Sequence, residues 1–214
     1  MSFSLVGRVW DGASFADYLR TVDLSWARGI TMHHTASPSL RQRPNGLKAQ
    51  HIQNIQSYYQ GTLGWSRGPH LFIDDDQIFG MSPLDERGVH AVSFNRSHIG
   101  IEVLGDYDSE DPYSGRGLAC WNMATRAAAA ILERTGWGVD SINGHRDDPR
   151  TSKSCPGKKV DLKDFRAGVQ ELMHAHEQDQ PMPRDSDRGG PDPIAMQSIE
   201  AIEWQLAKLK DRLG

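Results

Sequence analysis

Apolar residues recur along the chain in two patterns, and each pattern predicts one kind of element. Short apolar runs and apolar–polar alternation favour strands, in which every second side chain lies on the same face. They predict strands at residues 28–34, about 70–74, about 77–81, 98–105 and in a short stretch ending at His145. In the strand at 98–105, Glu102 lies on the face opposite to the branched side chains of Ile99, Ile101 and Val103.

Apolar residues spaced three or four positions apart indicate amphipathic helices. Helices are predicted on this basis at residues 47–60, 117–136 and 161–176. The second is rich in alanine and ends at Gly136, a residue type that commonly caps helix C-termini, and Asp161 is the expected N-cap of the third. Because strands and helices alternate, we predict an α/β (α+β) fold, with a mixed central β-sheet flanked by helices.

The composition changes after His176. Residues 177–193 are polar and rich in proline and glycine, as linkers are, and an apolar heptad pattern follows at 195–213. We therefore predict a domain at 1–176, a linker at 177–193 and an amphipathic helix at 194–214. An isolated helix of this length is marginally stable in water. It is expected to self-associate, with packing on the domain or contact with a membrane surface as alternatives.

Composition and charge exclude several classes of function. With 37% hydrophobic residues the chain of 214 residues can form a core, and its net charge of −4 gives no general attraction to nucleic acid. No apolar run approaches the roughly 20 residues of a membrane-spanning helix, so no integral membrane segment is expected. The N-terminus lacks the features of a cleaved signal peptide, and two cysteines do not form a disulfide framework. We expect synthesis in a reducing cytoplasm.

Three residues are candidate metal ligands: His33 and His145, each at the end of a predicted strand, and Cys155 in the loop that follows His145. Zinc binds imidazole and thiolate, and catalytic zinc sites have three protein ligands. The same residues are also compatible with structural histidines and a small buried cysteine. Residue types and spacing alone leave both interpretations open.

Four segments carry a resemblance to a known family: "ITMHHTAS", "GWSRGPHLFIDDDQIF", "VHAVSFNRSHIGIEVLGD" and "GHRDDPRTSKSCPG", in this order. Together they resemble the zinc-dependent N-acetylmuramoyl-L-alanine amidases, which include phage endolysins, bacterial recycling amidases and animal peptidoglycan recognition proteins. The resemblance covers about residues 28–172. It implies one Zn²⁺ ion bound by His33, His145 and Cys155.

The resemblance also implies roles for four further residues. Glu102 would move protons during amide hydrolysis, although a surface carboxylate is the alternative, and Lys153 would stabilise the oxyanion, although a solvated lysine is the alternative. His90 and Asn95 match a loop that lines the substrate groove, so we expect them to contact substrate. Pro69 stands where phage and animal relatives often carry a catalytic tyrosine, which places the proton transfer on Glu102.

The activity implied by the resemblance is hydrolysis of the bond between N-acetylmuramic acid and L-alanine, with peptidoglycan or muropeptides as partners. A phage or prophage endolysin that reaches the cell wall through a holin pore is the expected role. Two alternatives stay open. One is a non-catalytic module that binds muropeptides, although such relatives typically lack the cysteine ligand. The other is a cytosolic muropeptide-recycling amidase.

Overall fold

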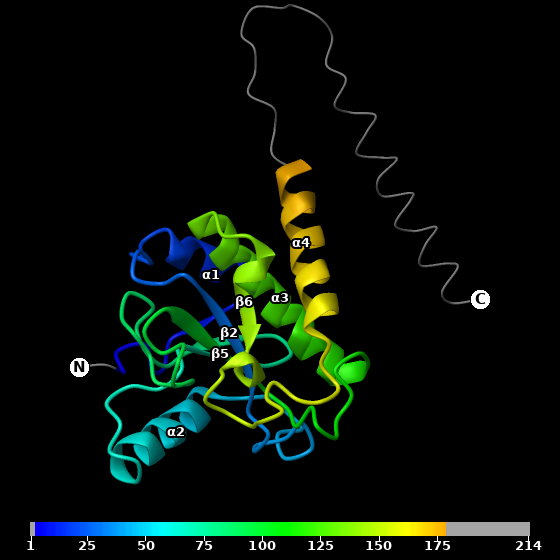
Figure 1. Ribbon diagram of the computed structural model, residues 1–214. Coiled ribbons are helices and arrows are strands. Elements are labelled where there is room, and N and C mark those ends of the chain that lie inside the picture. Colours follow the sequence, from blue (N-terminus) through cyan, green and yellow to red (C-terminus); the bar gives the residue numbers. More distant parts are fainter. Residues whose placement is uncertain (1–2, 179–214) are drawn as a thin grey trace, which may run out of the picture. The chain divides into compact units, whose positions relative to one another are not determined.

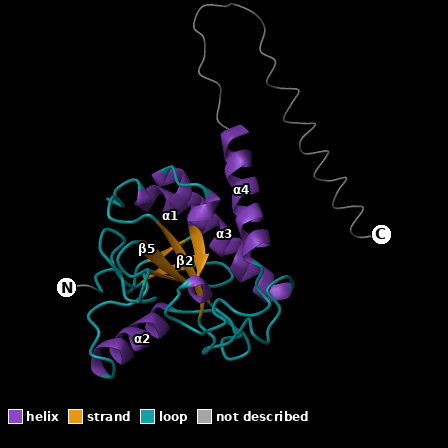
Figure 2. Cartoon of the chain, in the orientation of Figure 1, coloured by secondary structure: helices purple, strands orange, loops and turns teal. Residues whose placement is uncertain are grey.

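A six-stranded mixed sheet forms the centre of the computed structural model, which describes residues 3–178 (Figures 1 and 2). The strand order is β1–β4–β3–β5–β2–β6, where β2 pairs in parallel with both β5 and β6. The strands are β1 Val9–Trp10, β2 Gly29–His34, β3 Leu71–Ile73, β4 Ile78–Gly80, β5 His98–Val103 and β6 Ile142–Gly144. The predicted linker and C-terminal helix lie outside the described residues.

Four α-helices accompany the sheet in the described part of the chain: α1 Gly12–Leu19, α2 Ala49–Gly61, α3 Gly115–Thr135 and α4 Leu162–Gln178. Helix α3 packs against both α1 and α4, whereas α2 lies apart from these three (Figure 2). No helix in residues 3–178 is long and apolar enough to span a membrane.

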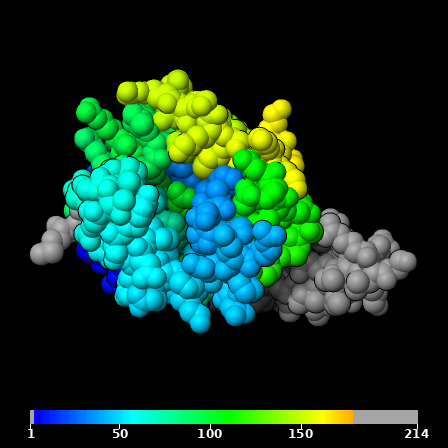
Figure 3. Space-filling view, turned by 90° about the horizontal axis from the view of Figure 1, so that it is seen from below, coloured from blue at the N-terminus to red at the C-terminus, as the bar shows by residue number. Residues whose placement is uncertain are grey.

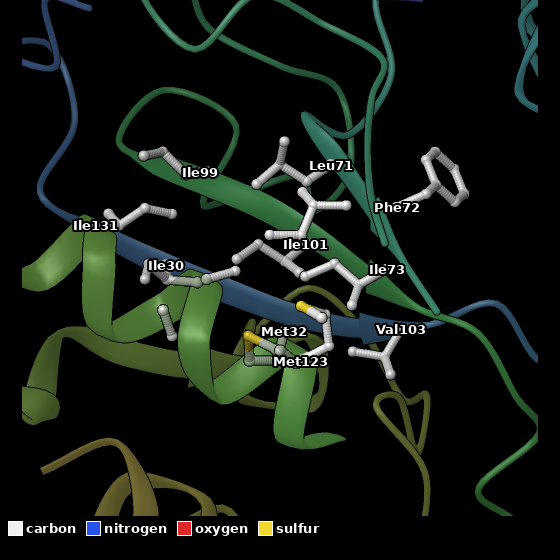
Figure 4. Packing of buried hydrophobic residues seen from close by; sticks show 14 of the residues in the cluster. Ile30, Met32, Leu71, Phe72, Ile73, Ile99, Ile101, Val103, Met123 and Ile131 are labelled. Atoms are coloured by element: carbon white, nitrogen blue, oxygen red, sulfur yellow. The ribbon is translucent and has the colours of Figure 1, made fainter. Parts of the chain in front are cut away.

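The core lies between α3 and one face of the sheet. Ile30 and Met32 of β2 are fully buried there, beside Met123 and Ile131 of α3 (Figure 4). Side chains alternate between the two faces of a strand, so Thr31 and His33 point to the other face. One face of β2 and β5 therefore packs on α3, and the other face of these strands carries His33 and Glu102.

Within residues 3–178, the strands and helices predicted from periodicity are present, with ends that differ by a few residues. Gly136 caps α3 in the left-handed conformation, with φ of 72°, and the carboxylate of Asp161 accepts a hydrogen bond of 2.7 Å from the amide of Lys163 at the start of α4. Apolar periodicity did not predict α1. Its signal was a capping box, in which Asp11 and Ser14 exchange hydrogen bonds between side chain and main chain.

Candidate metal centre

The three candidate ligands lie close together at one edge of the sheet. His33 lies near the end of β2, and His145 follows β6 directly; because the two strands are parallel neighbours, their ends meet at one edge. Cys155 lies in the loop after His145. The three ligand atoms lie within 4.8 Å of one another, so the structure joins residues that are up to 122 positions apart in the chain.

The geometry and the residue types fit zinc. Cys155 Sγ lies 3.6 Å from His33 Nδ1. A tetrahedral site with a Zn–S bond of about 2.3 Å and a Zn–N bond of about 2.0–2.1 Å requires a sulfur–nitrogen separation of about 3.6 Å. His33 is 2% exposed and Cys155 is 7% exposed. Burial lowers the pKa of His33 and raises the pKa of Cys155. A cation bound between them would favour the thiolate.

Arg146 holds the loop that presents Cys155. Its guanidinium donates hydrogen bonds to the carbonyl oxygens of Gly157 and Val160, at 3.0 and 2.8 Å. Its amide donates to the carbonyl of Cys155 at 2.7 Å. The basic side chain that follows His145 is therefore engaged with the main chain of its own loop, and it links the segment at His145 to the segment at Cys155.

A second group of potential ligands, Asp74–Asp76, has a different explanation. Asp74 accepts hydrogen bonds from the amides of Leu47 and Gln77, at 2.6 and 2.9 Å. Asp75 forms a bidentate pair with Arg116, with both contacts at 2.8 Å. The carboxylates of Asp74 and Asp75 therefore form hydrogen bonds that stabilise the turn between β3 and β4 and attach it to α3. This group has a structural role.

Glu102 faces the three candidate ligands. The register pairs Glu102 of β5 with His33 of β2, and side chains opposite each other in register share a face of the sheet. Its Oε1 lies 3.9 Å from His33 Nδ1, and it lines the same cavity as the triad. Burial raises the pKa of Glu102 to about 8, while the positive charge of Lys153 acts to lower it. The alternative of a surface carboxylate does not describe this position.

Lys153 lies two residues before Cys155 and also lines the cavity. Its positive charge contributes to lowering the pKa values of His33 and His145 and opposes the effect of burial on Glu102 and Cys155. A cation at this point could stabilise negative charge that develops on a substrate beside the triad.

The cavity around the triad has a volume of about 410 Å³. Figure 3 shows the surface hollowed between α2, the segment after β2 and the loop that contains Cys155. Tyr58, Tyr59 and Trp65, from α2 and the turn after it, line one side, and residues 34–38 line another. The helical period predicted α2, but it did not reveal that Tyr58 and Tyr59 line a cavity, because that depends on how α2 docks. Pro69 also lines the cavity and has no acid or base to offer.

His90 lines the cavity, whereas the side-chain oxygen of Asn95 is bonded to the backbone of its own loop. Both ring nitrogens of His90 have partners within the protein: Nδ1 lies 3.0 Å from His33 Nε2, and Nε2 lies 3.0 Å from the carbonyl oxygen of His98. Burial lowers the pKa of His90 to about 3, so its ring is neutral. The side-chain oxygen of Asn95 accepts hydrogen bonds from the amides of His90 and Ala91, at 2.7 and 2.9 Å, and so braces this loop.

The remaining residues of interest have structural contacts. His34 Nδ1 accepts a hydrogen bond of 3.0 Å from the amide of Tyr107. His70 accepts from the amide of Gly100 and contacts the carbonyl oxygen of Glu86, at 2.9 and 3.0 Å. Cys120 is fully buried in α3.

Comparisons with known proteins agree with this architecture. A family model described as N-acetylmuramoyl-L-alanine amidase matches residues 24–158. Peptidoglycan-recognition protein SC2 of Drosophila melanogaster is 27% identical over 153 residues, which cover 71% of this chain and 78% of that protein. The N-acetylmuramoyl-L-alanine amidase XlyA of Bacillus subtilis is 28% identical over 145 residues, which cover 65% of this chain and 43% of that protein.

Solved structures show the same fold. The catalytic domain of XlyA superimposes with a TM-score of 0.52 at 23% identity, covering 67% of this chain and 86% of that one. The amidase LysC from Clostridium intestinale gives a TM-score of 0.53 at 22% identity, with 68% and 86% covered. The predicted α/β fold with a mixed sheet is confirmed.

Proposed function

The chain belongs to the N-acetylmuramoyl-L-alanine amidase family, and on that premise we propose that it hydrolyses the bond between N-acetylmuramic acid and L-alanine in peptidoglycan. One zinc ion would be held by His33, His145 and Cys155. The observation that supports catalysis most strongly is the position of Glu102, whose carboxylate lies beside the triad in the same cavity. A module that only binds peptidoglycan needs no such group at that point.

Glu102 and Lys153 have different roles in the proposed reaction. When bound, zinc supplies a Lewis acid, which polarises the scissile carbonyl and lowers the pKa of a water molecule. Glu102 accepts the proton that this water loses as its oxygen adds to the carbonyl carbon. Lys153 donates a hydrogen bond to the carbonyl oxygen as negative charge develops there. Glu102 then returns the proton to the nitrogen as the C–N bond breaks, which leaves a lactyl carboxylic acid and the amine of L-alanine, and the acid then gives its proton to the amine or to solvent.

The proposal is tested by digesting purified peptidoglycan with the zinc-loaded protein, with and without a chelator. Mass spectrometry should detect stem peptides that begin with L-alanine, and these products should disappear with the chelator. One relative is a peptidoglycan-recognition protein, so binding without cleavage is the rival outcome. Tight binding to the polymer with no released peptide would establish that recognition role instead.

An endolysin role requires a particular form of the substrate, the intact cell wall. We propose that the protein acts on the intact cell wall, which it would reach through a holin pore after synthesis in the cytoplasm. Equal amounts of intact sacculi and of soluble muropeptides should then be compared as substrates. Cleavage of the sacculi fits an endolysin, whereas cleavage restricted to soluble fragments would indicate a recycling amidase.

Replacing Lys153 with methionine removes the charge and keeps most of the side-chain length. We expect kcat to fall about 100-fold with little change in KM, because the charge acts on the oxyanion of the transition state and not on the bound substrate. Steady-state kinetics with a soluble muropeptide measures both constants. The matched control is Lys158→Met, an exposed lysine of the same loop that is not among the residues lining the cavity. An equal loss in both variants would contradict a specific role for Lys153.

Trp65 is expected to bind the substrate at the aromatic wall of the cavity. Its ring is 38% exposed and packs beside Tyr59, with ring centroids 5.3 Å apart. An aromatic ring at a groove wall offers an apolar surface to a sugar or peptide. We expect Trp65→Ala to weaken peptidoglycan binding roughly tenfold, as a co-sedimentation assay would measure. Leu118→Ala, which removes an exposed apolar residue of α3 outside the cavity, should bind normally.

A further inference from the structure

A line of hydrogen bonds connects the first metal ligand to the backbone of the sheet. The ring of His33 contacts the ring of His90 through Nε2 and Nδ1 at 3.0 Å. The other nitrogen of His90, Nε2, contacts the carbonyl oxygen of His98 at 3.0 Å. His98 is the first residue of β5, the strand that carries Glu102. The line therefore starts at a fixed backbone atom and ends at a residue of the triad.

The carbonyl oxygen determines where each proton lies along this line. It can only accept a hydrogen bond, so Nε2 of His90 carries a proton. The neutral ring then has an unprotonated Nδ1, which accepts a hydrogen bond from the N–H at His33 Nε2. His33 in turn keeps an unprotonated Nδ1. That atom is the one that lies 3.6 Å from Cys155 Sγ and faces the proposed metal position.

We propose that His90 is a positioning residue, which selects the tautomer of His33 and orients its ring so that Nδ1 binds the metal. This inference rests on the proposed function only for the identity of the site as a zinc centre. Histidine ligands in metalloproteins commonly donate their second N–H to a fixed acceptor, and this contact orients the ring and increases its basicity. Here the acceptor is a second imidazole, whose own orientation is set by the main chain.

The residues around His90 pack closely against it and hold it in place. A Cβ at Gly100 would lie 2.5 Å from Cγ of His90, so glycine is required where the ring crosses β5. Asn95 fixes the amides of His90 and Ala91. These contacts hold the ring from the strand side and the loop side, as expected for a group whose direction matters.

A substrate-binding role for His90 explains these hydrogen bonds less well than the positioning role does. Both ring nitrogens already have partners inside the protein, and a hydrogen bond to substrate would require one of them to be given up. The expected contribution of His90 is therefore to metal affinity. Asn95, whose side-chain oxygen bonds to the loop backbone, contributes by supporting His90.

Two substitutions separate the hydrogen bond from the shape of the ring. His90→Phe keeps a planar ring and removes both nitrogens. His90→Asn places an oxygen near the position of Nδ1, so it can still accept from His33. We expect the zinc dissociation constant, measured by competition with a chromophoric chelator, to rise about 10- to 100-fold in His90→Phe. It should stay close to the wild-type value in His90→Asn. Unchanged affinity in a folded His90→Phe protein would overturn the proposal.

The matched control is His98→Asn. This variant changes the side chain of His98 and keeps the carbonyl group that His90 uses, so zinc affinity should not change. Nitrogen-15 NMR of the metal-free protein supplies a second readout, because it reports the tautomer of His33 directly. Wild-type His33 should carry its proton on Nε2, and His90→Phe should lose this preference. A wild-type His33 protonated on Nδ1 would contradict the inference even if His90→Phe did not fold.

The two readouts also separate this inference from the proposed function. If the wild-type protein bound no zinc, the proposed amidase mechanism would fail, while the tautomer of His33 would still test whether His90 positions it. If the wild-type protein bound zinc and cleaved peptidoglycan but His90→Phe bound zinc equally well, the amidase proposal would stand and the positioning role would be rejected.

Discussion

Peptidoglycan hydrolysis is expected to be lost in the Cys155→Ala variant, together with its zinc. The variant leaves two histidines, and a site that has lost its thiolate has also lost the only negative charge among its three ligands. We expect activity to fall at least about 1000-fold, which corresponds to roughly 4 kcal/mol of transition-state stabilisation. Metal content by atomic emission spectrometry and release of stem peptides by mass spectrometry measure the two effects in one sample.

The chain offers a matched control in its second cysteine. Cys120 is fully buried in α3 and lies outside the cavity. Cys120→Ala should keep full zinc content and activity, with a small loss of thermal stability from the missing sulfur. Removing zinc from the wild-type protein with a chelator should reproduce the Cys155→Ala result, and adding zinc back should reverse it. A metal-free protein that still released stem peptides would refute the zinc mechanism.

Glu102→Gln should separate chemistry from binding. The amide has nearly the shape of the carboxylate but cannot accept a proton, so kcat should fall about 10²- to 10⁴-fold. Zinc content and KM should stay near wild-type values, because Glu102 is not one of the three ligands. Steady-state kinetics on a soluble muropeptide, with metal analysis of the same preparation, measures all three quantities.

The effect on kcat should be specific to this carboxylate. Glu133→Gln is a suitable control, because Glu133 lies on α3 and pairs with His176 at 2.7 Å, away from the cavity. It should have wild-type kcat. A Glu102→Gln variant with unchanged kcat would mean that another group moves the proton. Since Pro69 offers no acid or base, that group would have to be sought among the tyrosines of the α2 wall.

The position of the site within the fold explains why these residues work together. β2, β5 and β6 are neighbours at the centre and edge of the sheet, and they supply His33, Glu102 and the approach to His145. Their opposite faces carry fully buried side chains, Ile30, Ile101 and Ile142. His33 and Glu102 are therefore held by paired strands whose other face is buried, whereas the loop with Lys153 and Cys155 completes the site from one side.

Local sequence patterns determined much of this arrangement. Alternation in "HIGIEVLG" placed Glu102 on the face opposite to Ile99, Ile101 and Val103, and the structure shows that separation. The residue types of His33, His145 and Cys155, with the motifs around them, predict a zinc site, and this stays a prediction. The assignment of faces succeeds because strand and helix periods act over a few residues, so that each element's own sequence determines its faces.

Tertiary structure alone decided which faces meet. That Glu102 stands opposite His33 depends on the register of β2 and β5, and that Tyr59 and Trp65 form a wall depends on how α2 docks. The sequence suggested His90 as a substrate contact, and only the coordinates place it between His33 and the carbonyl of His98. The physical reason is that pairing between distant segments is set by the packing of the whole core. Hydrophobic periodicity determines the face on which a side chain lies, but not its neighbour across 57 or 122 residues of chain.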